Sequence, residues 1–279
     1  MAKYDLLPEQ LLYEGTASAS DFFAPTLLRE EDLLRTHTAE YWRRLQAGEL
    51  TRKEARAIGF PLSPKLLTRG RHIAQGTLDC ARYAMREGVA LNIAGGTHHS
   101  FADRGEGFCV FNDIAIAANV LLDAGEVSRV LVVDLDVHQG NGTAKLFGGD
   151  ARVFTLSFHG ERNYPLRKER SDLDVGFADE TGDDEYLAKL AEVLGPLLDA
   201  FRPELVFYLS GVDVLAADKL GRLALSIDGC RERDRVVLEA CAARELPVAV
   251  AMGGGYAERL ATIVEAHANT YRVARAVYE

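Results

Sequence analysis

Hydrophobic runs and amphipathic stretches alternate along the chain from about residue 67 to its end. The run "RVLVVDLD" is apolar on both sides of an extended chain, whereas "DDEYLAKLAEVLGPLLDAF" repeats its apolar residues at helical spacing. Strands that are apolar on both faces and separated by amphipathic helices predict a mainly parallel sheet between two helical layers, an α/β/α fold. The predicted strands are 89–96, 129–136, 152–158, 204–211 and 247–255, and the predicted helices are 71–88, 112–125, 144–149, 183–201, 231–245 and 258–278.

The first 70 residues are predicted to be helical and to form an outer layer. Within "REEDLLRTHTAEYWRRL", residues 29–45, apolar and aromatic side chains recur at helical spacing. We expect His37 and Trp42 to be packing residues rather than metal ligands, because no residue of ligand character stands beside them. The residues expected near one face of this segment are Leu33, Leu34, His37, Tyr41 and Leu45.

Composition narrows the class of protein. With 279 residues, of which 48% are hydrophobic and 27% charged, and without a Pro/Ser-rich linker, the chain is predicted to form a single domain over residues 1–279. The formal net charge of -10 argues against a nucleic-acid binder, which needs a basic face to neutralise phosphates.

Cysteine usage and hydropathy indicate a cytoplasmic setting. The chain shows no close CxxC pair, no secretory leader and no apolar run of the ~20 residues that cross a bilayer. We therefore expect no membrane span and free thiols in a reducing compartment. The cysteines are Cys80, Cys109, Cys230 and Cys241.

Polar side chains follow each of the five predicted strands. In open α/β sheets, ligands bind beyond the carboxyl ends of the strands, so these segments are expected to meet in one site. They are Gly95-Gly96-Thr97-His98-His99, Asp134-Leu135-Asp136-Val137-His138, Ser157-Phe158-His159, Gly211-Val212-Asp213 and Gly253-Gly254-Gly255-Tyr256.

Two carboxylates and one imidazole are candidate metal ligands. Asp136 and His138 lie on the same side of an extended segment, because strand side chains repeat every second residue. Asp213 from a neighbouring strand end would complete an open catalytic site for a divalent ion such as zinc. The alternative is that Asp136 caps the following turn and His138 is a satisfied core histidine.

The tandem histidines and a tyrosine are candidate catalytic residues. His98 and His99 can serve one site only if the chain turns, which Gly95-Gly96 permits. A histidine is the usual base for a water activated by a metal, and Asp134 and Asn141 are candidates to stand behind the pair.

Tyr256 follows three glycines and could donate to a developing oxyanion, although a loop aromatic covering the core edge is the alternative. A nucleotide site fits less well. "GNGTAK" lacks the third glycine of a dinucleotide loop, and Lys145 lacks the preceding glycine of a phosphate loop.

Four motifs, in this order, resemble the zinc-dependent histone deacetylase and acetylpolyamine amidohydrolase superfamily. They are "GGTHHSFADRGEGFCVFND", "VDLDVHQGNG", "SGVDVLAADKLGRL" and "GGGY", and the likeness covers roughly Glu30 to the C-terminus. "DLDVHQGNG" and "DKLGRL" are most similar to class IV deacetylases and their bacterial relatives. The resemblance implies the three-layer arginase/deacetylase fold. It also implies removal of acetyl or longer acyl groups from N-acyl-lysine or a small acylated amine.

The resemblance further implies a role for each matched residue. Zinc, or iron(II) in the cell, would be held by Asp136, His138 and Asp213. His99 would be the base, backed by Asn141, and His98 its electrostatic partner, oriented by Asp134, with Tyr256 as the oxyanion donor. The substrate channel would comprise the Gly107 carbonyl, which accepts the substrate amide N–H, the aromatic walls Phe108 and Tyr164, and Leu220. A structural potassium ion would use Asp134, the Ser157 hydroxyl and backbone oxygens of Asp136, His138 and Phe158.

Three departures from the family pattern shape these expectations. The first strand and loop of family members are expected to be missing ahead of the N-terminal helix. Asn141 replaces an aspartate of class I members, and Leu220 replaces the acidic gatekeeper of polyamine-selective enzymes. Cys109 is expected to be a buried structural thiol.

Other functions stay open at this stage. An acetylpolyamine amidohydrolase would share the chemistry, and a non-catalytic acyl-lysine binding protein could retain the pocket. An arginase-type ureohydrolase would need further aspartates to bridge a second manganese ion. The strand end at Asp213 has no aspartate two residues later.

Overall fold

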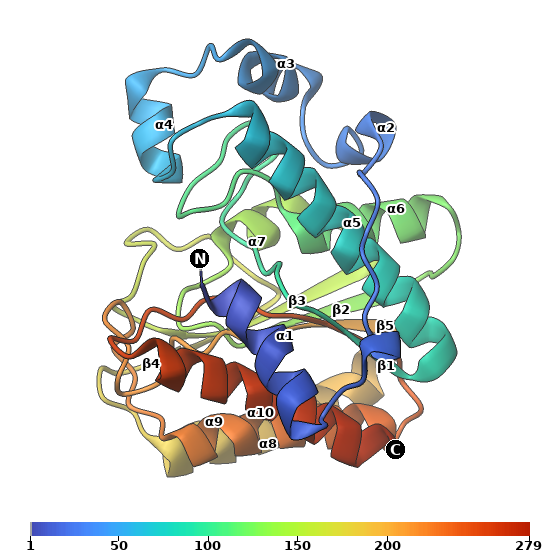
Figure 1. Cartoon of the computed structure of the whole chain (residues 1–279), viewed down its shortest axis with the longest axis vertical. Coiled ribbons are helices and arrows are strands. Elements are labelled where there is room, and N and C mark those ends of the chain that lie inside the picture. The colour runs from blue at the N-terminus through green and yellow to red at the C-terminus, as the bar shows by residue number, and fades with distance from the viewer. Residues whose placement is uncertain (1) are drawn as a thin grey trace.

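In the computed structural model, which describes residues 2–279, a six-stranded sheet forms the centre (Figure 1). Its strand order is β1-β6-β5-β2-β3-β4, and every neighbouring pair is parallel. This confirms the predicted parallel α/β sheet. The strands are β1 (Val89–Asn92), β2 (Val130–Asp134), β3 (Val153–Gly160), β4 (Leu173–Phe177), β5 (Leu205–Leu209) and β6 (Val248–Ala251).

Helices cover both faces of the sheet. Figure 1 shows α5 and α6 on one side, and α8, α9 and α10 on the other, with α1 packed on α10. On β2, Val130 and Val132 belong to the hydrophobic core under the first layer, while Leu131 and Val133 belong to the core under the second. A strand buried on both faces is therefore apolar at every position, as its sequence indicates.

The helix bounds in the described chain are α1 (Lys3–Glu14), α2 (Glu30–Leu33), α3 (Ala39–Ala47), α4 (Arg52–Ile58), α5 (Pro64–Glu87), α6 (Asp113–Asp123), α7 (Asn141–Phe147), α8 (Asp183–Phe201), α9 (Ile227–Ala242) and α10 (Leu260–Tyr278), with a short 3-10 turn, η1 (Ala19–Asp21). Helix α5 begins at Pro64 rather than at residue 71, because the Ser63 hydroxyl caps it by accepting from the backbone N–H of Leu66.

The periodic segment 29–45 is two helices rather than one continuous face. Thr38 ends the run by capping α3, where its hydroxyl accepts from the backbone N–H of Tyr41 at 3.2 Å. The break rotates the preceding turn, so Leu34 is 37% exposed while Leu33 is buried. The expectation that Leu34 shares the buried face is therefore wrong.

Two strand assignments also change. Strand β3 continues to Gly160 rather than ending at residue 158, so His159 lies inside the strand instead of beyond its end. Strand β4 was missed because it is an edge strand with alternating exposure and two acidic or glycine positions in five residues, which carry little strand signal.

The structure also describes the cysteines and the hydropathy of the helices. All four cysteines are free and buried, and this includes Cys109 of the motif "GGTHHSFADRGEGFCVFND". Burial raises the pKa of the Cys109 thiol, as expected for an inert structural cysteine. In residues 2–279, each helix is too short or too polar to cross a membrane.

His37 is a packing residue, as predicted. Its Nδ1 donates to the carbonyl of Phe101 at 2.9 Å, and its Nε2 accepts from the backbone N–H of Asn112 at 3.1 Å. Protonation of Nε2 would therefore place its new N–H against the Asn112 N–H, which opposes the charged form of His37. Burial lowers the pKa of His37 from 6.5 to about 4.

This geometry predicts acid sensitivity. Because the folded-state pKa of His37 is depressed, the unfolded chain binds the extra proton first, and stability is lost as the pH falls from about 6.5 towards about 4. Between about pH 7.5 and about pH 5, the free energy of unfolding should fall by about 2 kcal/mol more in the wild type than in His37→Gln. Urea unfolding at both pH values measures this, and parallel losses in the two proteins would contradict it.

Candidate active site

The carboxyl ends of the strands surround a cavity of about 510 Å³. Most residues predicted for the site line it, although they come from segments far apart in the sequence. Asp134, Asn141, Ser157 and Phe158 do not line it but are buried. The predicted residues on the cavity wall are His98, His99, Gly107, Phe108, Asp136, His138, Tyr164, Asp213, Leu220 and Tyr256.

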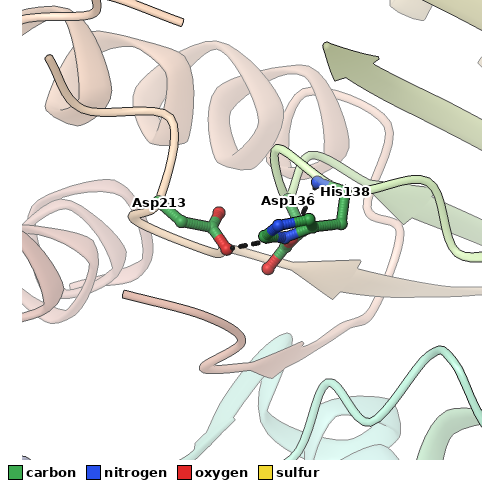
Figure 2. Close-up of side chains that lie close together, drawn as sticks. All are labelled: Asp136, His138 and Asp213. Atoms are coloured by element: carbon green, nitrogen blue, oxygen red, sulfur yellow. Dashed lines mark hydrogen bonds and ion pairs between the residues drawn. The ribbon is translucent and has the colours of Figure 1, made fainter. Parts of the chain in front are cut away.

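Asp136, His138 and Asp213 form the candidate metal centre. One ligand atom from each lies within 4.8 Å of the others, and Figure 2 shows the three side chains converging from two strand ends. His138 Nδ1 lies 2.9 Å from Asp136 Oδ1 and 3.2 Å from Asp213 Oδ2. Both carboxylates are almost completely buried.

The donor set fits a divalent cation. Asp213 Oδ2 is buried and accepts no hydrogen bond within the described chain, although His138 stands near it as an ion-pair partner. A buried carboxylate oxygen left without a donor costs free energy unless a cation or a ligand satisfies it. Two carboxylate oxygens and one imidazole nitrogen are ligands that zinc accepts.

Electrostatics at this centre favour positive charge. Burial lowers the pKa of His138, but Asp136 and Asp213 outweigh it and raise that pKa to about 10. Burial and the charge of Asp136 raise the pKa of Asp213 to about 6. Burial also opposes ionisation of Asp136, yet His98 and His138 hold the pKa of that carboxyl well below its usual range. The cluster therefore stabilises a positive charge at its centre.

Two glycines let the backbone approach these carboxylates. A Cβ atom added to Gly254 would collide with Asp213 Oδ2, and one added to Gly211 would collide with Asp136 Oδ2. The backbone N–H of Gly254 donates to Asp136 at 3.0 Å, and that of Val137 donates to Asp213 at 3.0 Å. The three strand ends thus hold one another's ligands in place.

The chain turns at Gly95-Gly96, which brings the tandem histidines together. Both glycines have positive φ, 83° and 75°, and the two imidazole centroids lie 4.1 Å apart. Asp113, at the start of α6, anchors the turn by accepting from the backbone N–H groups of Gly96 at 3.1 Å and Thr97 at 2.7 Å. Sequence reasoning missed Asp113, because it stands in a helical segment away from the strand ends.

The two histidines make matching contacts with different partners. His98 Nδ1 lies 2.7 Å from Asp134 Oδ2, and His99 Nδ1 lies 2.7 Å from Asn141 Oδ1. Burial lowers the pKa of His98, but the charges of Asp134 and Asp136 outweigh it and raise that pKa to about 9. For His99, burial and the neighbouring His98 and His138 lower the pKa well below its usual value.

The uncharged amide of Asn141 explains part of this difference, since it orients His99 without attracting a second proton. Its carbonyl can accept only from an Nδ1–H, so the Nε2 of a neutral His99 keeps a lone pair. Helix α7 begins at Asn141, earlier than the predicted residue 144. A Cβ atom at Gly142 would approach the backbone of His99 to 2.7 Å, so the glycine permits this close turn.

The mouth of the cavity is aromatic. Tyr164 packs edge-on against His99 with centroids 4.9 Å apart, and its hydroxyl donates to Glu106 at 2.8 Å. The ring centroids of Phe108 and Tyr256 lie 5.9 Å apart, and both side chains are exposed. Burial and the charges of Asp136 and Asp213 raise the pKa of Tyr256, so its hydroxyl remains a donor at neutral pH. The Gly107 carbonyl is 3.4 Å from the Cys109 thiol, which donates to it.

Two of the predicted potassium ligands lie on neighbouring strands. Asp134 of β2 and Ser157 of β3 are direct partners across the sheet. The Ser157 hydroxyl lies 3.0 Å from His159 Nδ1, and Asp134 Oδ1 accepts from the backbone N–H of Asp136. Use of these atoms for potassium stays a prediction.

The N-terminal helix supplies cavity residues that no motif indicated. Tyr4 of α1 and Arg69 of α5 line the cavity, and the Arg69 guanidinium lies 4.9 Å from the Tyr4 ring centroid. The Lys3 amino group donates to the carbonyl of Gly253 at 3.3 Å. No candidate catalytic or metal-binding residue stands beside Lys3, Tyr4 or Arg69 in the sequence. Only the packing of α1 shows that they lie at the site.

Comparisons with known proteins place these features in a family context. Residues 1–271 match the family described as the histone deacetylase domain. An uncharacterized protein of Picosynechococcus sp. is 43% identical over 100% of this chain and 93% of its own length. Histone deacetylase 2 of Arabidopsis thaliana is 33% identical over 94% of this chain and 70% of its own. The histone deacetylase-like amidohydrolase of Pseudomonas aeruginosa is 32% identical over 82% of this chain and 64% of its own.

Solved structures share the fold. The crystal structure of a histone deacetylase homologue from Aquifex aeolicus has a TM-score of 0.82 at 25% identity, covering 96% of this chain and 77% of that one. A homologue crystallised with SAHA has a TM-score of 0.84 at 25% identity, with 97% and 77% coverage.

Proposed function

The chain belongs to the histone deacetylase family, and we propose that it is a zinc-dependent amidohydrolase that removes acetyl or longer acyl groups from N-acyl-lysine or a small acylated amine. Family membership by itself supports a deacetylase-type hydrolase. The observation that carries the finer proposal is the buried Asp136, His138 and Asp213 cluster, whose Asp213 Oδ2 lacks a hydrogen-bond partner, beside the neutral His99 in one cavity.

Asp136, His138 and Asp213 would hold the divalent ion, for which we propose zinc, or iron(II) in the cell. When bound, such an ion polarises a substrate carbonyl and lowers the pKa of water towards ~7. The single cluster of this kind among the described residues favours one metal over the two-manganese arginase arrangement.

The protein's own groups would move the protons. His99 Nε2 accepts the proton from the attacking water, because Asn141 occupies Nδ1 without adding charge. The pKa of His98 is raised to about 9, and its ring centroid lies 4.1 Å from that of His99, so it is a positively charged neighbour. The Tyr256 hydroxyl donates to the oxyanion that develops on the substrate carbonyl. A histidine then returns a proton to the leaving amine, which yields a carboxylate and a free amine.

The cavity mouth favours an acyl-lysine substrate over a polyamine. Leu220 is 46% exposed at this mouth and offers no carboxylate to a second ammonium group. Arg162 and Arg222 also line the cavity, where both pair with Asp179 and offer no carboxylate to a substrate ammonium group. Phe108 and Tyr164 would contact the apolar part of the lysine chain, and the Gly107 carbonyl would accept its amide N–H.

Hydrolysis of acetyl-, butyryl- and myristoyl-lysine peptides and of acetylated polyamines, combined with metal analysis, tests this function. We expect turnover of at least one acyl-lysine peptide, with Tyr256→Phe slower by on the order of 10²-fold because it lacks the oxyanion donor. Bound zinc without turnover of any substrate would instead favour an acyl-lysine binding protein. Equal rates for wild type and Tyr256→Phe would contradict the role of Tyr256.

A further inference from the structure

Arg233 of α9 is completely buried against the two segments that carry the candidate metal ligands. Its guanidinium uses all five N–H donors in hydrogen bonds within the protein. Nη1 donates to the carbonyls of Leu135 at 3.1 Å and Gly211 at 2.6 Å. Nη2 donates to the carbonyl of Ser210 at 3.2 Å, and the remaining bonds go to Asp234.

The three carbonyls lie where two strands part. The last paired residues of β2 and β5 are Asp134 and Leu209, and the ladder ends there. After the hydrogen bond from the Leu135 N–H to the Leu209 carbonyl, no backbone hydrogen bond joins the two segments in the described chain. The carbonyls of Leu135, Ser210 and Gly211 are instead satisfied by one planar cation that bridges both strand ends.

The carbonyls that Arg233 binds are close in sequence to the candidate metal ligands. Leu135 directly precedes Asp136, and Gly211 lies two residues before Asp213. Gly211 also packs against the Asp136 carboxylate so closely that a Cβ atom would collide with it. Any shift of the Gly211 carbonyl would therefore move the backbone that packs against Asp136. It would also move the backbone that leads to Asp213.

Asp234 supplies the counter-charge and fixes the guanidinium. It is fully buried, accepts two hydrogen bonds from Arg233, and receives the hydroxyls of Tyr208 and Thr270. These hydroxyls come from β5 and α10, so sheet and helices hold the pair in one orientation. A lysine could not satisfy three divergent carbonyls, because its ammonium lacks the planar fork.

We propose that Arg233, held by Asp234, is a positioning residue for the metal centre that sets the separation of the two strand ends carrying Asp136 and Asp213. This inference rests on the proposed metal-dependent function. Arg233 acts through the Leu135, Ser210 and Gly211 carbonyls and touches neither the ion nor the substrate. Its effect should appear in metal affinity itself, apart from any effect on catalysis.

The experiment measures the Zn²⁺ dissociation constant of the full chain by competition with a chromophoric chelator, alongside thermal unfolding. We expect Arg233→Lys to bind Zn²⁺ about 10- to 100-fold more weakly than wild type, the range typical of lost outer partners of metal ligands. A second variant, Arg233→Met with Asp234→Leu, removes both charges together, so the core keeps no uncompensated ion, and its thermal unfolding shows whether it is folded. It should lose at least as much affinity, because it donates to none of the three carbonyls.

Leu194→Ala serves as the control for general destabilisation, since Leu194 is a buried residue of α8 outside the cavity wall. It should lower the unfolding temperature and leave Zn²⁺ affinity unchanged. Wild-type Zn²⁺ affinity in the folded double variant, or an equal loss in Leu194→Ala, would overturn the positioning role while leaving the proposed function intact. Failure of the wild type to bind Zn²⁺ would overturn the proposed function as well.

Discussion

Replacing Asp213 with asparagine is expected to weaken divalent metal binding by more than about 100-fold. Loss of a residue that only hydrogen-bonds to a metal ligand costs up to about 100-fold, and loss of a ligand should cost more. The change keeps the shape of the side chain, and Oδ1 can still accept from the backbone N–H of Val137. It replaces the buried Oδ2, which accepts no hydrogen bond, with a poor ligand and removes one negative charge from the centre. Hydrolysis should fall with metal occupancy.

Metal content after dialysis against a defined free Zn²⁺ concentration measures this effect. Asp32→Asn is a matched control, because Asp32 is also buried but pairs with Arg29 and Arg35 outside the cavity. The control should retain wild-type Zn²⁺ content. If Asp213→Asn binds Zn²⁺ as tightly as the control does, Asp213 is not a ligand.

Replacing His99 with alanine should lower kcat by about 10²- to 10⁴-fold, the usual contribution of general acid–base catalysis. His99 is neutral, and its Nδ1 is held by Asn141, so its Nε2 is the basic atom facing the cavity. In the described chain, His99 forms no hydrogen bond or ion pair with either carboxylate of the centre. Its loss should therefore leave Zn²⁺ binding nearly unchanged.

Steady-state kinetics on an acyl-lysine peptide, together with Zn²⁺ content, separate the two roles. His37→Gln is a suitable control, because His37 is a buried packing histidine that does not line the cavity. It should retain most of the activity. A His99→Ala protein that loses its Zn²⁺, or one that keeps full kcat, would contradict a role as general base.

Much of the site could be predicted because its ligands follow the strands directly. Asp134 closes β2, and Asp136, His138 and Asp213 come within a few residues of their strand ends. In a parallel sheet the carboxyl ends share one edge, so local sequence is enough to place these side chains near each other. The apolar runs that identify the strands therefore also locate the chemistry.

The supporting residues could not be placed in the same way. Arg233 and Asp234 fall on the apolar stripe of α9 that also carries Cys230, Val237 and Cys241, which was the one available signal that these charges are buried. Their partners lie directly after β2, in and directly after β5, and in α10, and no sequence period connects those segments. Lys3 and Asp113 likewise reach the site only through the packing of α1 and α6.

By itself, then, the sequence determined the parallel sheet, the edge at which the chemistry collects, and the residues whose spacing puts them there. Those features depend on local periodicity and on hydrophobic burial, which each segment carries within a few residues. The tertiary structure alone decided the edge strand β4 and the network that joins the two strand ends. These depend on edge exposure and on hydrogen bonds between distant segments, so only the folded chain brings the partners together.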